Sequence, residues 1–247
     1  MSDPVNVVVH AELEKIGSPS QQQLYSLLSE EEQQEVVEKM TTFVRQPAGH
    51  LPRQDELYLE QQLTDIFGFE VSAELDGNRL TQTMGVMAAV PHQKRFPGDT
   101  LKEHSEYREA GMSERRGVYG WLTDMGQLTP QAILREKYGV AVQAQFQPDW
   151  HTNYRNFATW YKFRKMLVIC PSEGKAVVCS VINSGPSDWM RYQFGGTPEV
   201  IREAHVWSMK ARGKVMMFFV NDPQDTVQLG PRDLIRENSS KKIKISV

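Results

Sequence analysis

The chain has 247 residues, which suits one large domain or a medium domain with a small companion. Apolar residues make up 40% and charged residues 24%, an ordinary globular balance, and this length can bury a core without disulfide staples. The formal net charge of −3 gives no global electrostatic basis for binding nucleic acid or an acidic membrane surface. No stretch approaches the roughly 20 apolar residues that span a bilayer, so no transmembrane segment is expected.

The first residues carry acidic side chains and lack a basic segment followed by a long apolar one, so no signal peptide is predicted. The chain as written is expected to be cytoplasmic, or extracytoplasmic if a leader has been removed. The sequence does not set the oligomeric state.

The first 70 residues are predicted to form a helical domain. Ser29 followed by Glu32 is a capping box, and apolar residues behind it recur at helical spacing until Pro47 and Gly49. A second helix is predicted over about 54–67, with a glycine as its stop, and a shorter one over about 20–28. Three such helices would be marginally stable alone, so they are expected to dock on the rest of the chain.

A mixed second domain is expected over residues 71–235, followed by a loose tail over 236–247. Residues 80–90 favour β structure. A helix is predicted from Thr129 to near Gly139, then a strand over 140–146 and an aromatic-rich helix from Asp149 to about 162.

The clearest pattern is a hairpin, with strands at 165–170 and 175–182 around a Pro-Ser-Glu-Gly turn. A short helix is expected from Thr197, an N-cap, to about 205, and a continuous apolar run predicts a buried strand over 214–220. Cys170 and Cys179 flank the hairpin turn. They could form a disulfide across it, although two buried thiols are the favoured alternative.

Two segments carry a family resemblance: KAVVCSVINSGP (175–186) and FGGTPEV (194–200). The order strand, glycine turn, strand, Ser-Gly-Pro bend, Gly-rich loop, short helix and closing strand over 166–220 resembles the second half of a double-psi β-barrel. It is similar to the rare-lipoprotein-A-like lytic transglycosylases and the expansins. Upstream, His92 and the Pro-Gly-Asp ending at Asp99 also resemble a segment of those families, in which a His is followed by a Pro and a Gly before a strand. It also resembles a group of bacterial proteins that have a helical front.

The resemblance implies an α+β protein, with an N-terminal helical domain over 1–70 before a double-psi-like six-stranded β-barrel domain with inserted helices over 71–235. It also implies a cell-wall-associated protein that binds a peptidoglycan-like polysaccharide and has lytic activity. One departure weakens the lytic part: Asn183 stands where the lytic enzymes carry an aspartate, and an amide has no proton to donate as a general acid. A barrel that serves only as a binding or interaction module is therefore the alternative.

Glycan cleavage needs a carboxyl group held in a cleft, with its pKa raised so that it can protonate the leaving oxygen. The candidate acids are Asp188, beside an indole, and Asp99, in a Pro-Gly-Asp-Thr turn. His92 is the third catalytic candidate, because it could orient or protonate a substrate hydroxyl. Each also fits a plain role: a solvated loop carboxylate, a turn residue, and an imidazole bonded to backbone.

The expected groove lies between the loop 92–100 and the bend 183–189. Asn183 and Ser184 are predicted to hydrogen-bond sugar hydroxyls. Three aromatic side chains are predicted to stack on sugar rings, with core packing as their alternative role: Trp189, Tyr192 and Trp121.

No metal site and no cofactor are predicted. His92, Asp99, Glu103 and His104 are of types that bind zinc or manganese, but their spacing fits no known ligand rule. Neither a Walker loop nor a Rossmann glycine fingerprint occurs.

Overall fold

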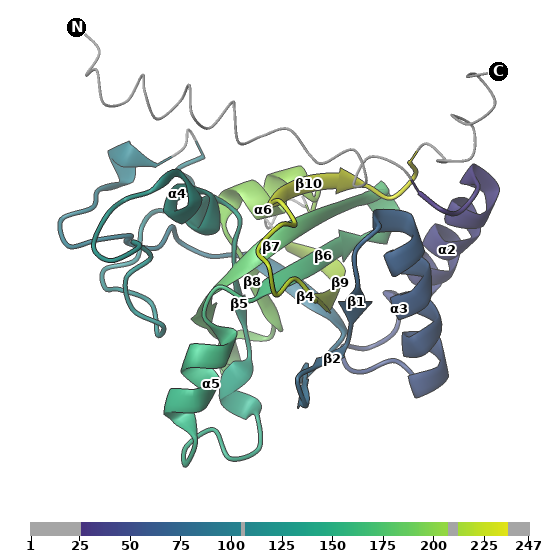
Figure 1. The fold of residues 1–247 in the computed structure, drawn as a ribbon, viewed down its shortest axis with the longest axis horizontal. Helices are drawn as coiled ribbons and strands as arrows, with labels where there is room; N and C mark the ends of the chain where they lie inside the picture. The colour runs from purple at the N-terminus through teal and green to yellow at the C-terminus, as the bar shows by residue number, and fades with distance from the viewer. Residues whose placement is uncertain (1–25, 105–106, 207–211, 237–247) are drawn as a thin grey trace, which may run out of the picture.

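The protein is an α+β structure built around a closed β-barrel (Figure 1). The structure is a computed structural model and describes residues 26–104, 107–206 and 212–236. The barrel strands are β4 (Met84–Ala89), β5 (Gly139–Val142), β6 (Lys165–Cys170), β7 (Lys175–Ser184), β8 (Phe194–Gly196) and β9 (Arg212–Val220). They pair in the ring order β4-β8-β5-β7-β6-β9, and β9 pairs with β4 again. The pairs β4–β8 and β5–β7 are parallel, and the others are antiparallel. The predicted α+β class with a six-stranded barrel is thus confirmed.

The facing segments 166–169 of β6 and 216–219 of β9 are apolar throughout, because both of their faces are covered. Val168 and Met217 belong to the core that fills the barrel. Their neighbours Leu167 and Phe218 point outward into a second core, which the N-terminal helices cover. A strand buried on both faces loses the polar alternation of a half-exposed strand, so a continuous apolar run is the expected pattern.

Helices α2 (Glu30–Phe43) and α3 (Arg53–Phe67) pack on the outside of the barrel and share that second core with it (Figure 1). The capping box of Ser29 and Glu32 is present, and Gly68 ends α3 in the left-handed conformation with φ 73°. Both predicted helices are confirmed. The shorter helix predicted over 20–28 falls partly outside the described residues, and residues 26–28 are not helical. The predicted tail from 237 onward lies outside them as well.

The remaining elements surround the barrel. Three helices are α4 (Pro130–Lys137), α5 (Tyr154–Tyr161) and α6 (Pro198–Glu203). The 3-10 turns are η2 (Leu101–Glu103), η3 (Ala144–Phe146), η4 (Pro171–Glu173) and η5 (Asp188–Met190). The short strands are β1 (Val71–Ser72), β2 (Glu74–Leu75), β3 (Asn78–Arg79) and β10 (Gly230–Asp233). In the described part of the chain, no helix has the length and apolar character needed to cross a membrane.

Two element bounds differ from those predicted. The strand predicted over 140–146 ends at Val142, because the next side chain, Gln143, turns to donate to the carbonyl of Pro186 while η3 begins. The helix predicted from Asp149 begins at Tyr154. Asp149 has φ 62°, a left-handed conformation that the first turn of an α-helix cannot contain.

The predicted hairpin forms, but its two cysteines are not opposite each other. Cys179 is paired with Met166 across the β6–β7 ladder, and Cys170 with Lys175. Both are buried free thiols. The favoured alternative is confirmed, and the disulfide is not formed.

The barrel has two ends, which we name after the residues that mark them. At the His92 end, the loop that contains His92 follows β4 and α4 leads into β5. At the Pro186 end, the bend after β7 meets the start of β4, since Gln193 donates its backbone N–H to the carbonyl of Val86. The parallel pairing of β4 with β8 fixes this polarity.

Gly139 is the point where α4 turns closely into the barrel. A Cβ there would lie 2.9 Å from the Glu136 carbonyl oxygen and 2.2 Å from Cδ1 of Ile182. We expect Gly139→Ala to lower the free energy of unfolding by about 1–3 kcal/mol through overpacking, measured by urea denaturation. Gly213→Ala is the control, because its nearest contact is a side-chain methyl at 3.1 Å. If the two variants lost equal amounts of unfolding free energy, the close packing at Gly139 would not be the cause.

Candidate functional site

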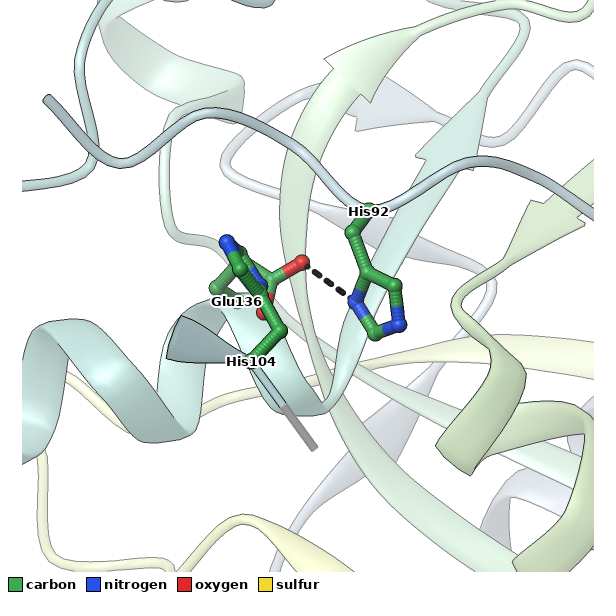
Figure 2. A group of neighbouring side chains, drawn as sticks. All are labelled: His92, His104 and Glu136. Carbon is green, nitrogen blue, oxygen red and sulfur yellow. Dashed lines mark hydrogen bonds and ion pairs between the residues drawn. The ribbon is translucent and has the colours of Figure 1, made fainter. Parts of the chain in front are cut away.

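Two imidazoles and one carboxylate meet beside α4 at the His92 end (Figure 2). Nδ1 of His92 lies 3.0 Å from Oε1 of Glu136, and Nδ1 of His104 lies 2.9 Å from Oε2 of the same carboxylate. The side chains of both histidines are 0% exposed and that of Glu136 is 4% exposed. One carboxylate therefore bridges two rings in the protein interior.

Local structure places each member of this cluster. Thr129 caps α4 by accepting from the backbone N–H of Ala132, which sets Glu136 on the buried face of the helix one turn later. The backbone of His92 pairs with the segment 111–113 through Gly111 and Ser113. His104 follows η2, which begins with a capping box of Thr100 and Glu103.

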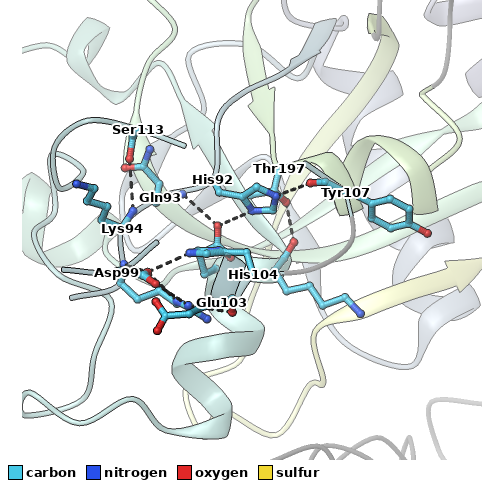
Figure 3. Close-up of polar contacts among 12 residues, drawn as sticks. His92, Gln93, Lys94, Asp99, Glu103, His104, Tyr107, Ser113 and Thr197 are labelled. Carbon is cyan, nitrogen blue, oxygen red and sulfur yellow. Dashed lines mark hydrogen bonds and ion pairs between the residues drawn. The ribbon is translucent and has the colours of Figure 1, made fainter. Parts of the chain in front are cut away.

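A second layer of contacts surrounds the histidines (Figure 3). Nε2 of His104 lies 3.0 Å from Oδ2 of Asp99, and Nε2 of His92 lies 2.7 Å from the carbonyl oxygen of Tyr107. Arg95 donates from its backbone N–H and from two guanidinium nitrogens to Asp99, at 2.7–2.9 Å. Every ring nitrogen of the two histidines thus faces an oxygen acceptor.

The electrostatics of the cluster favour its charged form. Burial alone would lower the pKa of His104, but its contacts with Asp99 and Glu136 outweigh burial and raise the pKa to about 9. Burial likewise opposes charge on His92, whose pKa is nevertheless raised, chiefly by Glu136. Burial by itself would raise the pKa of both carboxyls, Asp99 and Glu136. Hydrogen bonds from Arg95 and His104 keep the pKa of Asp99 well below its usual range, and those from His104 and His92 lower that of Glu136. These four groups and Arg95 together hold the loop 92–104 against α4.

Of the residues singled out from the sequence, His92 and Asp99 do lie in one cluster, joined through His104. Asp99 is 3% exposed and His92 is 0% exposed, so both lie beneath the surface. Sequence reasoning missed Arg95 and Glu136. The available signal was weak: Glu136 lies four residues after the buried Ala132, so an acidic residue occupies the inner stripe of α4.

Asn183 lies next to this loop, and its side chain is engaged by protein groups. Its Oδ1 accepts from the backbone N–H groups of Val118 and Ser184, at 3.0 Å each, and its Nδ2 lies 3.4 Å from Oε1 of Gln93. Ser184 hydrogen-bonds Oε1 of Gln145 at 2.7 Å. Gln93 of the loop 92–100 and Asn183 are therefore neighbours, but their polar groups bond to each other and to backbone. The rest of the predicted bend, over 186–189, lies at the Pro186 end.

Of the other candidates, Trp121 lies beside this loop, since the backbone N–H of Leu122 donates to the carbonyl of Arg95 at 3.1 Å, and the rest belong to or follow η5. Asp188 and Trp189 form η5 at the Pro186 end, and the indole is 76% exposed. Tyr192 is half-buried and its hydroxyl lies 3.2 Å from the sulfur of Met190. Trp121 is half-buried, and its backbone carbonyl accepts from Nζ of Lys162.

An open pocket of about 560 Å³ lies at the Pro186 end. Rings of Phe146 and Phe157 line it, together with polar side chains from β3, from the segment between β3 and β4, and from the residue after η3: Asn78, Arg79, Gln82 and Gln147. Gln82 connects this pocket to the bend before η5, because it donates to Gln143, which donates to the carbonyl of Pro186. The volume lies within the range of small-ligand sites.

Behind the pocket, Arg79 pairs with the fully buried carboxylate of Glu56, which also accepts from Thr83 at 3.1 Å. This pairing holds β3 and the segment that follows it, which carry Asn78 and Gln82. No sequence pattern pointed to the pocket, because its walls combine residues 77–82 with residues 146–157, which are far apart in the chain.

No known family model matches this chain, and no curated protein does so either. The fold and the two sites therefore carry the functional argument.

Proposed function

We propose that this protein binds a glycan, such as a peptidoglycan-like polymer, at the Pro186 end of a barrel of the double-psi type. The observation that carries the proposal is the open pocket, where Phe146 and Phe157 lie among amide and guanidinium side chains. Sugars present apolar ring faces to aromatic side chains and a rim of hydroxyls to polar ones, so such a lining suits them. The exposed indole of Trp189 at the same end adds a further surface for stacking.

Two features support the double-psi assignment. The parallel pairs β4–β8 and β5–β7 lie within an otherwise antiparallel ring, and a short helix, α6, stands between β8 and β9 as in the resembling families. The cell-wall assignment rests on that resemblance.

We further propose that binding proceeds without cleavage by Asp99 or Asn183. A carboxyl whose pKa is depressed by Arg95 and His104 carries no proton to donate near neutral pH. Asn183 is an amide held by backbone N–H groups. Of the predicted acids, Asp188 alone lies at the same end of the barrel as the pocket, so it is the carboxyl that any lytic activity would require.

The test is binding of the full chain to purified sacculi and to soluble cell-wall oligosaccharides. We expect Phe146→Ala/Phe157→Ala to weaken binding by at least about tenfold, which corresponds to roughly 1.4 kcal/mol. Met125→Ala removes a fully exposed apolar side chain from a different loop and serves as the matched control. If the double variant bound as well as the wild type, the pocket would not be the glycan-binding site.

Mass spectrometry of the soluble fraction separates binding from cleavage. Retention of the protein on sacculi with no released fragments supports a binding protein. Released fragments that disappear in Asp188→Asn would instead show that the barrel is lytic, with Asp188 as its acid.

A further inference from the structure

The cluster at the His92 end has the donor atoms of a metal centre. One ring nitrogen of His92, one ring nitrogen of His104 and a carboxylate oxygen of Glu136 all lie within 4.8 Å of one another. Ligand atoms around a tetrahedral zinc ion are about 3.3 Å apart when bonds are about 2.0–2.1 Å. The two nitrogen–oxygen distances of 3.0 and 2.9 Å are close to that separation.

The outer nitrogens of the two rings are held in the way that metal-ligating histidines usually are. Nε2 of His104 faces the Asp99 carboxylate, and Nε2 of His92 faces the carbonyl oxygen of Tyr107. Contacts of this kind keep the ring proton on Nε2 and leave the Nδ1 lone pair for a metal ion. Arg95 in turn fixes Asp99 through two guanidinium nitrogens.

Glu136 lies between the two rings. Each of its oxygens faces one Nδ1 atom, and Oε1 also accepts from the backbone N–H of Gln93 at 3.1 Å. The ring centroids of His92 and His104 are 4.9 Å apart, on either side of this carboxylate. The three side chains are therefore placed so that one cation can contact all of them.

We propose that His92, His104 and Glu136 bind a divalent ion of the zinc class, which fastens the loop 92–104 to α4. Two imidazoles and one carboxylate form a recurrent ligand set for zinc, and both oxygens of Glu136 face the site. The ion has a structural role, since the side chains of its ligands are at most 4% exposed. None of these three residues lines the pocket, so metal binding can be tested independently of the proposed glycan binding.

The first measurement uses the wild-type chain. Elemental analysis after purification from zinc-supplemented medium should give about one zinc per chain. The chelator-treated protein should bind Zn²⁺ and Co²⁺ with 1:1 stoichiometry and a raised Tm. The Co²⁺ form should show two paramagnetically shifted exchangeable imidazole N–H signals, because both Nε2 protons remain. No bound metal and no change in Tm with either ion would overturn the proposal.

Three variants assign the ligands. Glu136→Gln should weaken Co²⁺ binding by about 100-fold or more, and Asp99→Asn by roughly 10- to 100-fold, since it orients a ligand. Glu203→Gln changes a partly buried carboxyl that accepts from the Tyr138 hydroxyl, away from the cluster, and should bind normally. Equal affinity in Glu136→Gln and the wild type would overturn the assignment. If Glu136→Gln does not fold, the wild-type Co²⁺ form tests the ligands instead: two shifted imidazole N–H signals support the two histidine ligands, and their absence contradicts them.

Discussion

Asp99→Leu is expected to lower the free energy of unfolding by about 3–5 kcal/mol, because it leaves a buried guanidinium without its carboxylate. The side chain of Asp99 is 0% exposed and that of Arg95 is 3% exposed, so water cannot replace the lost partner. Asp99 also holds the outer nitrogen of His104, so that ring loses its anchor too. The measurement is urea unfolding at pH 7, monitored by circular dichroism.

The double variant Arg95→Met/Asp99→Leu separates an uncompensated charge from a simple loss of packing. Replacing both partners removes the stranded charge, so the double variant should recover at least half of the loss. Glu109→Leu is the matched control. It breaks an acid–arginine pair with Arg202 whose side chains are 38% and 35% exposed, and should cost less than about 1 kcal/mol. A double variant as unstable as the single one would show that the loss comes from the contacts of Asp99 with His104 and the backbone, and not from the stranded guanidinium charge.

The parts of the fold that could be predicted are those written in local patterns. The capping box of α2, the hairpin of β6 and β7 and the apolar run of β9 each depend on residues that are neighbours in sequence. In contrast, β10 was not predicted. It is a four-residue strand that contains Pro231, and only its pairing with β7 makes it a strand.

Two members of the candidate site, His92 and Asp99, could be predicted from local sequence, but Glu136 could not. His92 and Asp99 stood out because they lie in a loop rich in Pro and Gly, and such loops often carry function. Glu136 is 44 residues from His92 in the chain, and a glutamate in a helix is ordinarily a solvated residue. Ligand-spacing rules assume neighbouring donors, so they could not assemble a cluster whose third member comes from a different element.

The two ends of the barrel differ in what their polar groups contact. At the His92 end, imidazoles, carboxylates and guanidinium bond to one another and fix a long loop. At the Pro186 end, aromatic rings and amides line an open pocket. Substitutions at the first end should therefore change stability, whereas substitution of exposed residues at the second, such as Phe146, should change binding with little effect on stability.

A second large effect is expected at Lys165, a buried cation on β6. Its side chain is 6% exposed, and its Nζ lies 2.6 Å from carboxylate oxygens of Asp222 and Asp225. Lys165→Met should lower the free energy of unfolding at pH 7 by about 3–5 kcal/mol, because Asp222, 4% exposed, loses its countercharge. Lys175→Met on β7 is the control. Its pair with Asp233 is half exposed, so its loss should cost less than about 1 kcal/mol.

The effect of Lys165→Met should depend on pH in a defined direction. Burial would raise the pKa of Asp222, but hydrogen bonds from Lys165 and from the backbone of Thr226 and Val227 outweigh burial and lower it. A carboxyl with a lowered folded pKa contributes stability above its unfolded pKa of about 4, and that contribution is lost as the pH falls toward the folded value. Without Lys165 the folded pKa rises, so the variant has less to lose on acidification. Urea unfolding between about pH 7 and pH 3 should therefore show the gap between wild type and Lys165→Met narrowing below about pH 4; a gap that stays constant would mean that Lys165 stabilises the barrel through its methylene chain and not through its charge.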